Sequence, residues 1–351
     1  MANSLSRQPS TFSRRLLRAF AFGVCGILVT GLSACGIPGN DSSNKFTVGV
    51  FPLYVSMPVW VAQEQGIFEQ HGLDVDVKTI LSGPTLISAL NSNSIDVMLN
   101  GATIALSARA TGQPINLITP TIPSSIYHMI ASKQVIDSCP YVNDPYPKPI
   151  LCAKGKRIGV GSLGTESHIA GITILEEAGL EETDASWVPA GGGEALGSSM
   201  QQGQIDIMFA EDTAATYATE VINVGSPLVD LKHDGPFADW FGNGAWALEP
   251  QLQQSPEKYQ QFADAVGDAI AWIKDPANVA EARAVFKKNA PNISDQTIDG
   301  VLASSTNSFG TTATCSSIET ITKWLTKTNQ IAEGKGPTTC RDIEWKTATF
   351  S

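Results

Sequence analysis

Residues 47–101, TVGVFPLYVSMPVWVAQEQGIFEQHGLDVDVKTILSGPTLISALNSNSIDVMLNG, predict the fold of the chain. The apolar run Thr47–Val50 indicates a buried strand that ends in a loop at Phe51-Pro52. Apolar residues at helical spacing over Pro58–Glu69 predict a helix, and His71-Gly72 is a typical helix end. A second strand is expected over Leu73–Leu81.

The second half of this stretch continues the alternation of strand and helix. After the loop Ser82–Pro84, we expect a helix from Thr85 to about Asn91 and a third strand over Ile95–Leu99. The order strand, helix, strand, helix, strand is the unit from which parallel sheets are built.

This unit occurs twice at a constant offset of 110 residues. Val48-Gly49-Val50 corresponds to Ile158-Gly159-Val160. Five further positions keep the same offset: Leu86, Leu90, Ile95, Asp96 and Met98 correspond to Leu196, Met200, Ile205, Asp206 and Met208. All such units resemble one another to some degree, but here the register does not drift over some fifty residues, which favours repeated architecture. The sequence therefore predicts an α/β protein with two similar lobes and mainly parallel sheets.

Two further apolar runs predict how the lobes are connected. Ile126–Ala131 has no helix before it and is interpreted as a strand that crosses into lobe two, and Ala245–Leu248 is interpreted as the strand that returns. A lobe-two strand is also expected over Val221–Val224. The expected organisation is a signal peptide (1–34), a tether (35–44), lobe one (45–126), lobe two (127–245) and a mainly helical return to lobe one (246–351) that packs against it.

The N-terminus is typical of an exported lipoprotein. Four arginines precede the uncharged stretch Ala19–Ala34, and Leu32-Ser-Ala-Cys35 resembles a lipobox, in which Cys35 takes a diacylglycerol. A plain cleavage site with an incidental cysteine is the alternative. The run Ser13–Arg18 loosely matches a twin-arginine signal, so the Sec and twin-arginine export routes both stay open.

Charge and hydropathy exclude some classes of partner. The formal net charge is −11, and it falls to −15 once residues 1–34 with their four arginines are removed. Such a surface repels phosphate backbones, so nucleic acid is excluded as a partner. We expect a monomeric body that meets the membrane only through its lipid.

Six cysteines are present, of which Cys25 leaves with the signal peptide. The four beyond Cys35 are Cys139, Cys152, Cys315 and Cys340, and they allow three pairings. Proximity favours Cys139 with Cys152 and Cys315 with Cys340. No C-x-x-C pair is present, so we expect structural disulfides rather than a metal site.

The run Pro58–Val77 resembles the start of solute-binding proteins of ABC importers, most of all the branch for nitrate, sulfonates, taurine and thiamine-pyrimidine precursors. Further matches are Gly83 before a helix, Gly112-Gln-Pro114 and Gly161–Thr165, and the resemblance covers about residues 45 to 250. It implies a fold like that of type II periplasmic-binding proteins, no cofactor, a permease partner, and a location on the extracytoplasmic face of the cell membrane.

The candidate ligand-binding residues lie at the carboxyl ends of the expected strands, where parallel sheets bind ligands and where two lobes would close by hinge motion. In lobe one they are Phe51, Leu53, Tyr54, Ser56, Ser82, Gly83, Asn100, Gly101 and Thr103. In lobe two they are Ser162, Gly164, Thr165, Gly191, Gly192, Gly193, Glu211, Asp212, Trp240 and Asn243.

Each candidate has a purely structural alternative. Ser82, Ser162 and Thr165 are also typical helix caps, and Tyr54 and Trp240 are also typical core residues. The glycines suit turns that need positive φ.

The expected ligand is neutral or amine-bearing with an aromatic part, resembling a thiamine-pyrimidine precursor. Glu211 and Asp212 directly follow an apolar strand, where burial is costly without a cation or hydroxyl partner. The candidate turns contain no Arg or Lys, which an anion such as nitrate, taurine or an alkanesulfonate would favour, although helix N-termini alone can hold anions. An enzyme of the thiamine-pyrimidine synthase-like branch is disfavoured because its cysteine cluster is absent, and a lipid-anchored sensor stays open.

Overall fold

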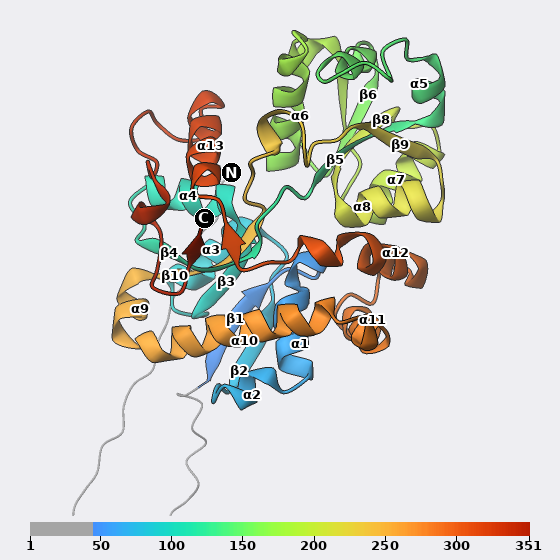
Figure 1. The fold of residues 1–351 in the computed structure, drawn as a ribbon. Coiled ribbons are helices and arrows are strands. Elements are labelled where there is room, and N and C mark those ends of the chain that lie inside the picture. The colour runs from blue at the N-terminus through green and yellow to red at the C-terminus, as the bar shows by residue number, and fades with distance from the viewer. Residues whose placement is uncertain (1–44) are drawn as a thin grey trace, which may run out of the picture. The chain divides into compact units, whose positions relative to one another are not determined.

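A computed structural model describes residues 45–351, which form one compact unit with two five-stranded sheets (Figure 1). The predicted signal peptide, the tether and Cys35 lie outside the described residues. No helix among residues 45–351 is long and apolar enough to span a membrane.

The first sheet belongs to lobe one and has the order β2-β1-β3-β10-β4. Its strands are β1 (Phe46–Val50), β2 (Val75–Thr79), β3 (Val97–Gly101), β4 (Ile115–Ile122) and β10 (Asn243–Leu248). β10 runs antiparallel to its neighbours β3 and β4, whereas β1 pairs in parallel with β2 and β3.

The second sheet belongs to lobe two and repeats this order as β7-β6-β8-β5-β9. Its strands are β5 (Tyr127–Ser132), β6 (Arg157–Val160), β7 (Ser186–Pro189), β8 (Ile207–Glu211) and β9 (Gly225–Val229). The predicted crossing strands are confirmed: β5 leaves lobe one and inserts antiparallel beside β8, and β10 returns to insert antiparallel beside β3.

The offset of 110 residues has a physical basis in both lobes. Asp96 Oδ2 accepts a hydrogen bond from the Thr47 amide at 2.7 Å, and Asp206 Oδ2 accepts one from the Arg157 amide at 2.9 Å. Each first strand contains a glycine that leaves room for two apolar side chains. These are Leu86 and Ile95 beside Gly49, and Leu196 and Ile205 beside Gly159. The two sheets are therefore built from one pattern, as the sequence predicts.

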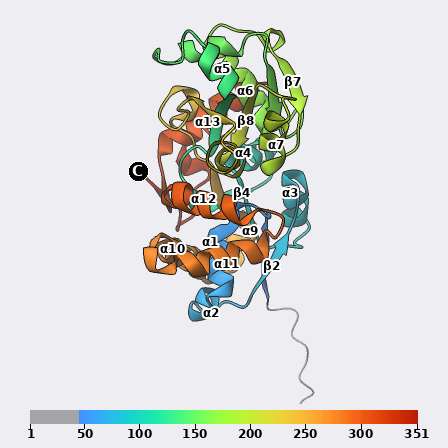
Figure 2. The same cartoon turned by 90° about the vertical axis from the view of Figure 1, so that its right-hand side faces the viewer.

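Helices cover both faces of each sheet (Figures 1 and 2). Those of the first half of the chain are α1 (Met57–Glu64), α2 (Ile67–Gln70), α3 (Gly83–Asn91), α4 (Ala102–Ala110), α5 (Lys133–Ser138) and α6 (Glu166–Glu177). The others are α7 (Glu194–Gln201), α8 (Asp212–Thr216), α9 (Glu249–Gln254), α10 (Pro256–Lys274), α11 (Val279–Asn289), α12 (Asp295–Ser305) and α13 (Cys315–Lys327).

Two predicted elements are wrong. The single helix expected over Pro58–Glu69 is divided into α1 and α2, because Gly66 adopts a φ of +67° that a continuous helix does not allow. The strand expected over Val221–Val224 is displaced: Tyr217–Val221 forms a π-helix, η4, and the strand β9 begins only at Gly225.

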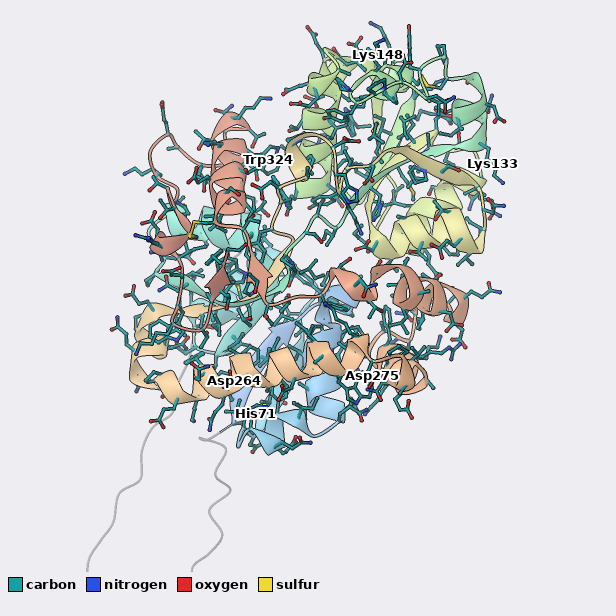
Figure 3. The ribbon with its side chains drawn as sticks, viewed as in Figure 1. His71, Lys133, Lys148, Asp264, Asp275 and Trp324 are labelled. Atoms are coloured by element: carbon teal, nitrogen blue, oxygen red, sulfur yellow. A yellow bond between two sulfur atoms is a disulfide. The ribbon has the colours of Figure 1, made fainter. Side chains whose placement is uncertain are left out.

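The C-terminal region packs against lobe one only in part. α10 and α11 contact α1, and α13 contacts α4, as expected, but α12 packs against α8 and η4 of lobe two. Trp324 on α13, labelled in Figure 3, also reaches lobe two, where its Nε1 donates to Thr173 Oγ1 at 2.8 Å. The prediction missed these contacts because an amphipathic pattern does not specify which surface a helix covers.

Both expected disulfides are present. Cys139 is bonded to Cys152 with a Cα–Cα distance of 5.6 Å, and Cys315 is bonded to Cys340 with a Cα–Cα distance of 5.1 Å. The first closes the loop after α5, and the second fastens the C-terminal segment to the start of α13.

Candidate functional site between the two lobes

The carboxyl ends of β3 and β6 are linked by a hydrogen bond between the lobes. Thr103, in the first turn of α4, donates its hydroxyl to Glu166 Oε2 at 2.5 Å, and Glu166 begins α6. A Cβ atom built on Gly101 would lie 3.7 Å from the same carboxylate oxygen. We call this region, with the residues described below, the interlobe site.

Glu166 is half-buried and has no basic partner among residues 45–351. Burial raises the pKa of its carboxyl group, and hydrogen bonds from Thr103 and Tyr127 oppose this effect. Tyr127 begins β5 and is 7% exposed, and its own pKa is raised by burial and by the charges of Glu166 and Glu211. Two carboxylates thus lie close to one phenol, and neither has a cation among its partners in the described part of the chain.

Glu211 is the second half-buried carboxylate. It caps α8, since its side chain accepts hydrogen bonds from the amides of Thr213 at 2.6 Å and Ala214 at 3.1 Å. Burial nevertheless raises the pKa of Glu211, and the neighbouring Asp212 adds to the shift. Capping therefore gives the Glu211 carboxylate two hydrogen bonds but no neutralising cation among residues 45–351.

Asp212 differs from Glu211 in having two basic side chains as partners. His128 Nε2 lies 2.9 Å and Lys232 Nζ 3.1 Å from Asp212 Oδ1. Burial opposes ionisation of Asp212, but these two neighbours outweigh it and lower its pKa. The basic groups of this region are thus engaged with Asp212 and are not directed at Glu166 or Glu211.

Asn100 Nδ2 is a buried polar atom of the interlobe site with no hydrogen-bond partner among residues 45–351. Asn100 is 2% exposed. The ring of Tyr54 is tilted against that of Phe309, with centroids 4.7 Å apart. Burial and, to a smaller extent, the charge of Asp212 in lobe two raise the pKa of the Tyr54 hydroxyl, and a hydrogen bond with Thr306 opposes this. Unpartnered buried polar groups are rare in folded proteins, so the free amide at the end of β3 favours a bound molecule.

Asn100 shows how lobe one presents a donor. Its Oδ1 accepts from the Gly101 amide at 2.9 Å, which leaves Nδ2 free. A Cβ atom on Gly83, the first residue of α3, would lie 3.6 Å from this Nδ2, so glycine leaves the space beside the amide open. A hydrogen-bond acceptor placed here would meet Asn100 and the N-terminus of α3 together.

Several predicted site residues hold local structure. Ser56 donates to the Phe51 carbonyl at 2.7 Å, and Ser82 caps α3 through the Thr85 amide. Thr165 donates to the Ser162 carbonyl at 2.7 Å, within the exposed turn that holds Gly164. Ligand contact by these side chains stays a prediction.

Others lie in the core or in exposed turns. Trp240 is 2% exposed and packs between Phe237 and Trp324, with ring centroids at 4.6 and 5.3 Å. Asn243 begins β10 and accepts from Thr121 Oγ1 at 3.2 Å. Three residues keep partial or full exposure beside the strand ends: Phe51 and Leu53 in lobe one and Gly192, between Gly191 and Gly193, in lobe two. Ligand contact by Trp240 and Asn243 also remains untested.

Sequence reasoning missed Glu166, Tyr127 and Thr213. A glutamate in the first turn of a helix is common because it complements the helix dipole, so Glu166 gave no separate signal. Its contact with Thr103 depends on how the two lobes meet, which no local pattern encodes.

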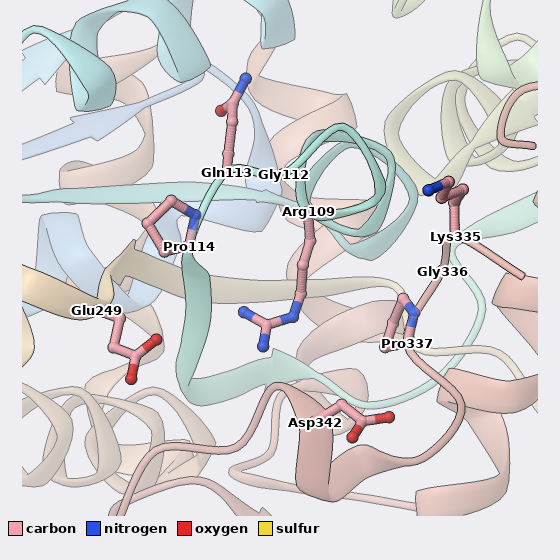
Figure 4. Close-up of a pocket in the computed structure, with 9 residues that line it drawn as sticks. All are labelled: Arg109, Gly112, Gln113, Pro114, Glu249, Lys335, Gly336, Pro337 and Asp342. Carbon is pink, nitrogen blue, oxygen red and sulfur yellow. The ribbon is translucent and has the colours of Figure 1, made fainter.

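A separate pocket of about 380 Å³ lies on lobe one (Figure 4). Arg109 points into it but donates to the Ile115 carbonyl at 2.8 Å and to Asn116 Oδ1 at 2.7 Å, which fastens the turn between α4 and β4. None of the pocket's lining residues belongs to the interlobe site. Among residues 45–351, no group of three or more His, Cys, Asp or Glu side chains is arranged to hold a metal ion.

The two-lobed fold with this strand order is that of the type II periplasmic-binding proteins. The family model described as "NMT1/THI5 like" matches residues 54–279, and the chain belongs to this family. A curated relative, the "Putative binding protein YtlA" of Bacillus subtilis (strain 168), is 38% identical over 55 residues. That match spans only 16% of this chain and 16% of the relative.

Solved structures with the same fold include both binding proteins and an enzyme. The aliphatic sulphonate binding protein SsuA from Escherichia coli has a TM-score of 0.67 at 17% identity, with 87% of this chain and 98% of that chain covered. The nitrate-binding protein NrtA from Synechocystis PCC 6803 has a TM-score of 0.58 at 14% identity, with 74% and 70% covered. The desulfurization enzyme DSZB has a TM-score of 0.58 at 16% identity, with 86% and 96% covered. At these identities the likeness shows the fold alone.

Proposed function

We propose that this protein is the solute-binding lipoprotein of an ABC importer. In this proposal Cys35 carries the lipid, the interlobe site captures a small amine-bearing molecule, and the closed form delivers it to a membrane permease. Family membership and the shared fold support a binding role, and the two half-buried carboxylates support the ligand chemistry.

We infer the chemical class of the ligand from two carboxylates of the interlobe site, Glu166 and Glu211. Burial raises the pKa of both carboxyl groups, and no basic side chain among residues 45–351 is a main cause of either shift. A ligand amine or ammonium would supply the missing positive charge and would replace Thr103 as the partner of Glu166.

The lobe-one donors suggest a second feature of the same ligand. Asn100 Nδ2 and the N-terminus of α3 would bind a hydrogen-bond acceptor such as a ring nitrogen or a carbonyl oxygen. An aminopyrimidine resembling a thiamine-pyrimidine precursor carries both an amine and ring acceptors. Nitrate and alkanesulfonates carry only acceptors, so they would leave Glu166 and Glu211 without a partner, whereas taurine carries an amine as well as a sulfonate.

A thermal-shift panel tests this proposal. The chain from Gly36 onward retains the whole compact unit and would be mixed with aminopyrimidines, taurine, nitrate and alkanesulfonates. A ligand at about a hundred times its Kd stabilises by about 2.7 kcal/mol, which the assay resolves. We expect a shift with the aminopyrimidines that is lost in Glu166→Gln and reduced in Glu211→Gln.

The exposed Glu257 provides the matched control, because Glu257→Gln makes the same chemical change away from the site. A shift with nitrate or alkanesulfonates alone would keep the transport function and reject the amine. Turnover of any compound in the panel would instead favour the enzyme alternative.

A further inference from the structure

We propose that His168 is a positioning residue that holds the lobe-two turn Gly161–Thr165 in its binding form while neutral and releases it when protonated. The inference rests on the proposed function in one respect, namely that this turn and the adjoining Glu166 contribute to ligand binding. It would make solute capture weaken as the pH falls.

The geometry gives His168 a defined contact with the turn. His168 lies in α6, one turn into the helix, and is 9% exposed. Its Nδ1 accepts a hydrogen bond from the Gly164 amide at 3.0 Å. Gly164 has a φ of +74° and no other heavy atom within 4 Å of a Cβ built on it, so the turn lacks packing support at this residue. The histidine ring therefore supplies the contact that fixes the Gly164 amide.

The turn that His168 contacts leads directly to Glu166. The turn runs directly into α6 through Thr165, whose side chain makes no capping bond to the helix and instead donates to Ser162. Glu166, the next residue, binds Thr103 of lobe one. A change in the turn at Gly164 is therefore transmitted over two residues to the carboxylate at the interlobe site.

The hydrogen bond fixes the tautomer of the ring. Because Nδ1 accepts, the proton of neutral His168 resides on Nε2, which is buried and has no hydrogen-bond partner in the described part of the chain. Trp187 of β7 covers the ring edge to face, with centroids 4.7 Å apart. Protonation would place a second hydrogen on Nδ1, facing the N–H of Gly164, and two donors cannot share this bond.

The surroundings of His168 favour the neutral form. Burial lowers the pKa of the ring below its ordinary value of about 6.5, and Glu182 on η3 (Glu182–Asp184), with Oε1 3.9 Å from Nε2, partly opposes this. Of the charged groups on the elements around α6, Glu182 is the one that acts on this pKa, while Glu166 on the same helix is directed at Thr103. The turn is thus held at neutral pH and released on acidification.

Two substitutions separate the hydrogen bond from the titration. His168→Asn keeps an acceptor at the position of Nδ1 but does not titrate, and His168→Leu removes the acceptor. Calorimetric titration with 4-aminopyrimidine is compared at about pH 7.5 and at a pH below the midpoint that NMR gives for the His168 ring, because burial lowers the pKa of this ring. Dividing each variant's Kd by that of the wild type at the same pH cancels the titration of the ligand itself.

At the higher pH we expect His168→Leu to raise the Kd about threefold to tenfold, the value of one hydrogen bond, and His168→Asn to stay within about twofold. At the lower pH the wild type should lose its advantage over His168→Leu, while His168→Asn keeps it. A constant ratio between wild type and His168→Asn at both pH values would overturn the proposal.

A second readout needs no ligand. In NMR spectra of the ligand-free chain, the Gly164 amide shifts should titrate with the same midpoint as the His168 ring and should not titrate in His168→Asn. Failure of 4-aminopyrimidine to bind would count against the proposed ligand class and not against the switch. A Gly164 amide that ignores the protonation of His168 would refute the switch whatever the ligand is.

Discussion

The contact between α7 and α12 leads to a prediction about what fastens lobe two to the C-terminal helices. Glu194 begins α7, and its Oε1 accepts hydrogen bonds from the Ser294 amide at 2.9 Å, from the Ser294 hydroxyl at 2.6 Å and from the Thr297 hydroxyl. Ser294 caps α12, and Thr297 is fully buried. One carboxylate oxygen therefore fixes the start of α12.

The expected loss of stability on replacing Glu194 follows from these three hydrogen bonds. A hydrogen bond to a charged group contributes about 1.5–3 kcal/mol when buried, but Glu194 is half-buried, so screening reduces each value. We expect Glu194→Ala to lower the free energy of unfolding by about 2–3 kcal/mol in total. Glu194→Gln keeps an acceptor but loses the charge, so its cost should be about 1 kcal/mol.

The stabilisation that Glu194 provides should depend on pH in a defined direction. Burial opposes the ionisation of Glu194, but the bonds from Ser294 and Thr297 and the charge of Lys287 outweigh it and lower the pKa. The stabilisation is therefore present above the ordinary glutamate pKa of about 4.5 and is lost as the pH falls through the lowered value. Glu194→Ala should lack this component of the acid-induced loss of stability.

Urea unfolding followed by circular dichroism gives the free energies, and hydrogen exchange locates the effect. Exchange in α12 should accelerate in Glu194→Ala, while the exposed Glu257→Ala serves as the matched control. A free energy within about 0.5 kcal/mol of the wild type, with unchanged protection of α12, would refute the role assigned to Glu194.

Three further predictions concern the core, the disulfides and the anchor. Gly49→Ala should lower the free energy of unfolding in urea by about 1–3 kcal/mol, because its Cβ would lie 2.6 Å from a buried Leu86 atom. Gly267→Ala, within α10, should instead raise this free energy by up to about 1 kcal/mol. Equal effects of the two substitutions would contradict this prediction. Replacing Cys315 and Cys340 by Ser should cost about 3 kcal/mol, and an unchanged unfolding midpoint would argue against the bond's contribution. Cys35→Ala should move the protein from the membrane fraction to the soluble fraction on cell fractionation, and unchanged membrane association would reject the lipid anchor.

The fold could be predicted largely because its determinants are local and repeated. Asp96 and Asp206 occupy equivalent positions before their strands, and the structure uses both to bind the amide of the first strand. The crossing strands were also recognisable, since Ile126–Ala131 is an apolar run with no helix before it and Ala245–Leu248 is a similar run. Such signals survive in a single sequence because burial and hydrogen bonding act over short segments.

The remaining features depend on contacts between distant segments. The apolar run Val221–Val224 suggests a strand, but the preceding residues continue from α8 into a π-helix that packs against α12. Glu166 has the pattern of a solvated first-turn acid, and only the meeting of the two lobes places it against Thr103. The sequence therefore located the strand ends where a ligand is expected but did not identify the carboxylate that connects the two lobes there.

The most direct test of the proposed function is the Kd of the wild type for an amine-bearing pyrimidine and for its deaminated counterpart, measured by calorimetry near pH 7. Loss of one charge-assisted hydrogen bond corresponds to about a tenfold weaker Kd or more. We predict that the amine binds at least about tenfold more tightly and that this difference falls to about twofold in Glu166→Gln. Equal affinity for the two pyrimidines, or tighter binding of nitrate or an alkanesulfonate, would contradict the assignment of an amine-binding site between the lobes.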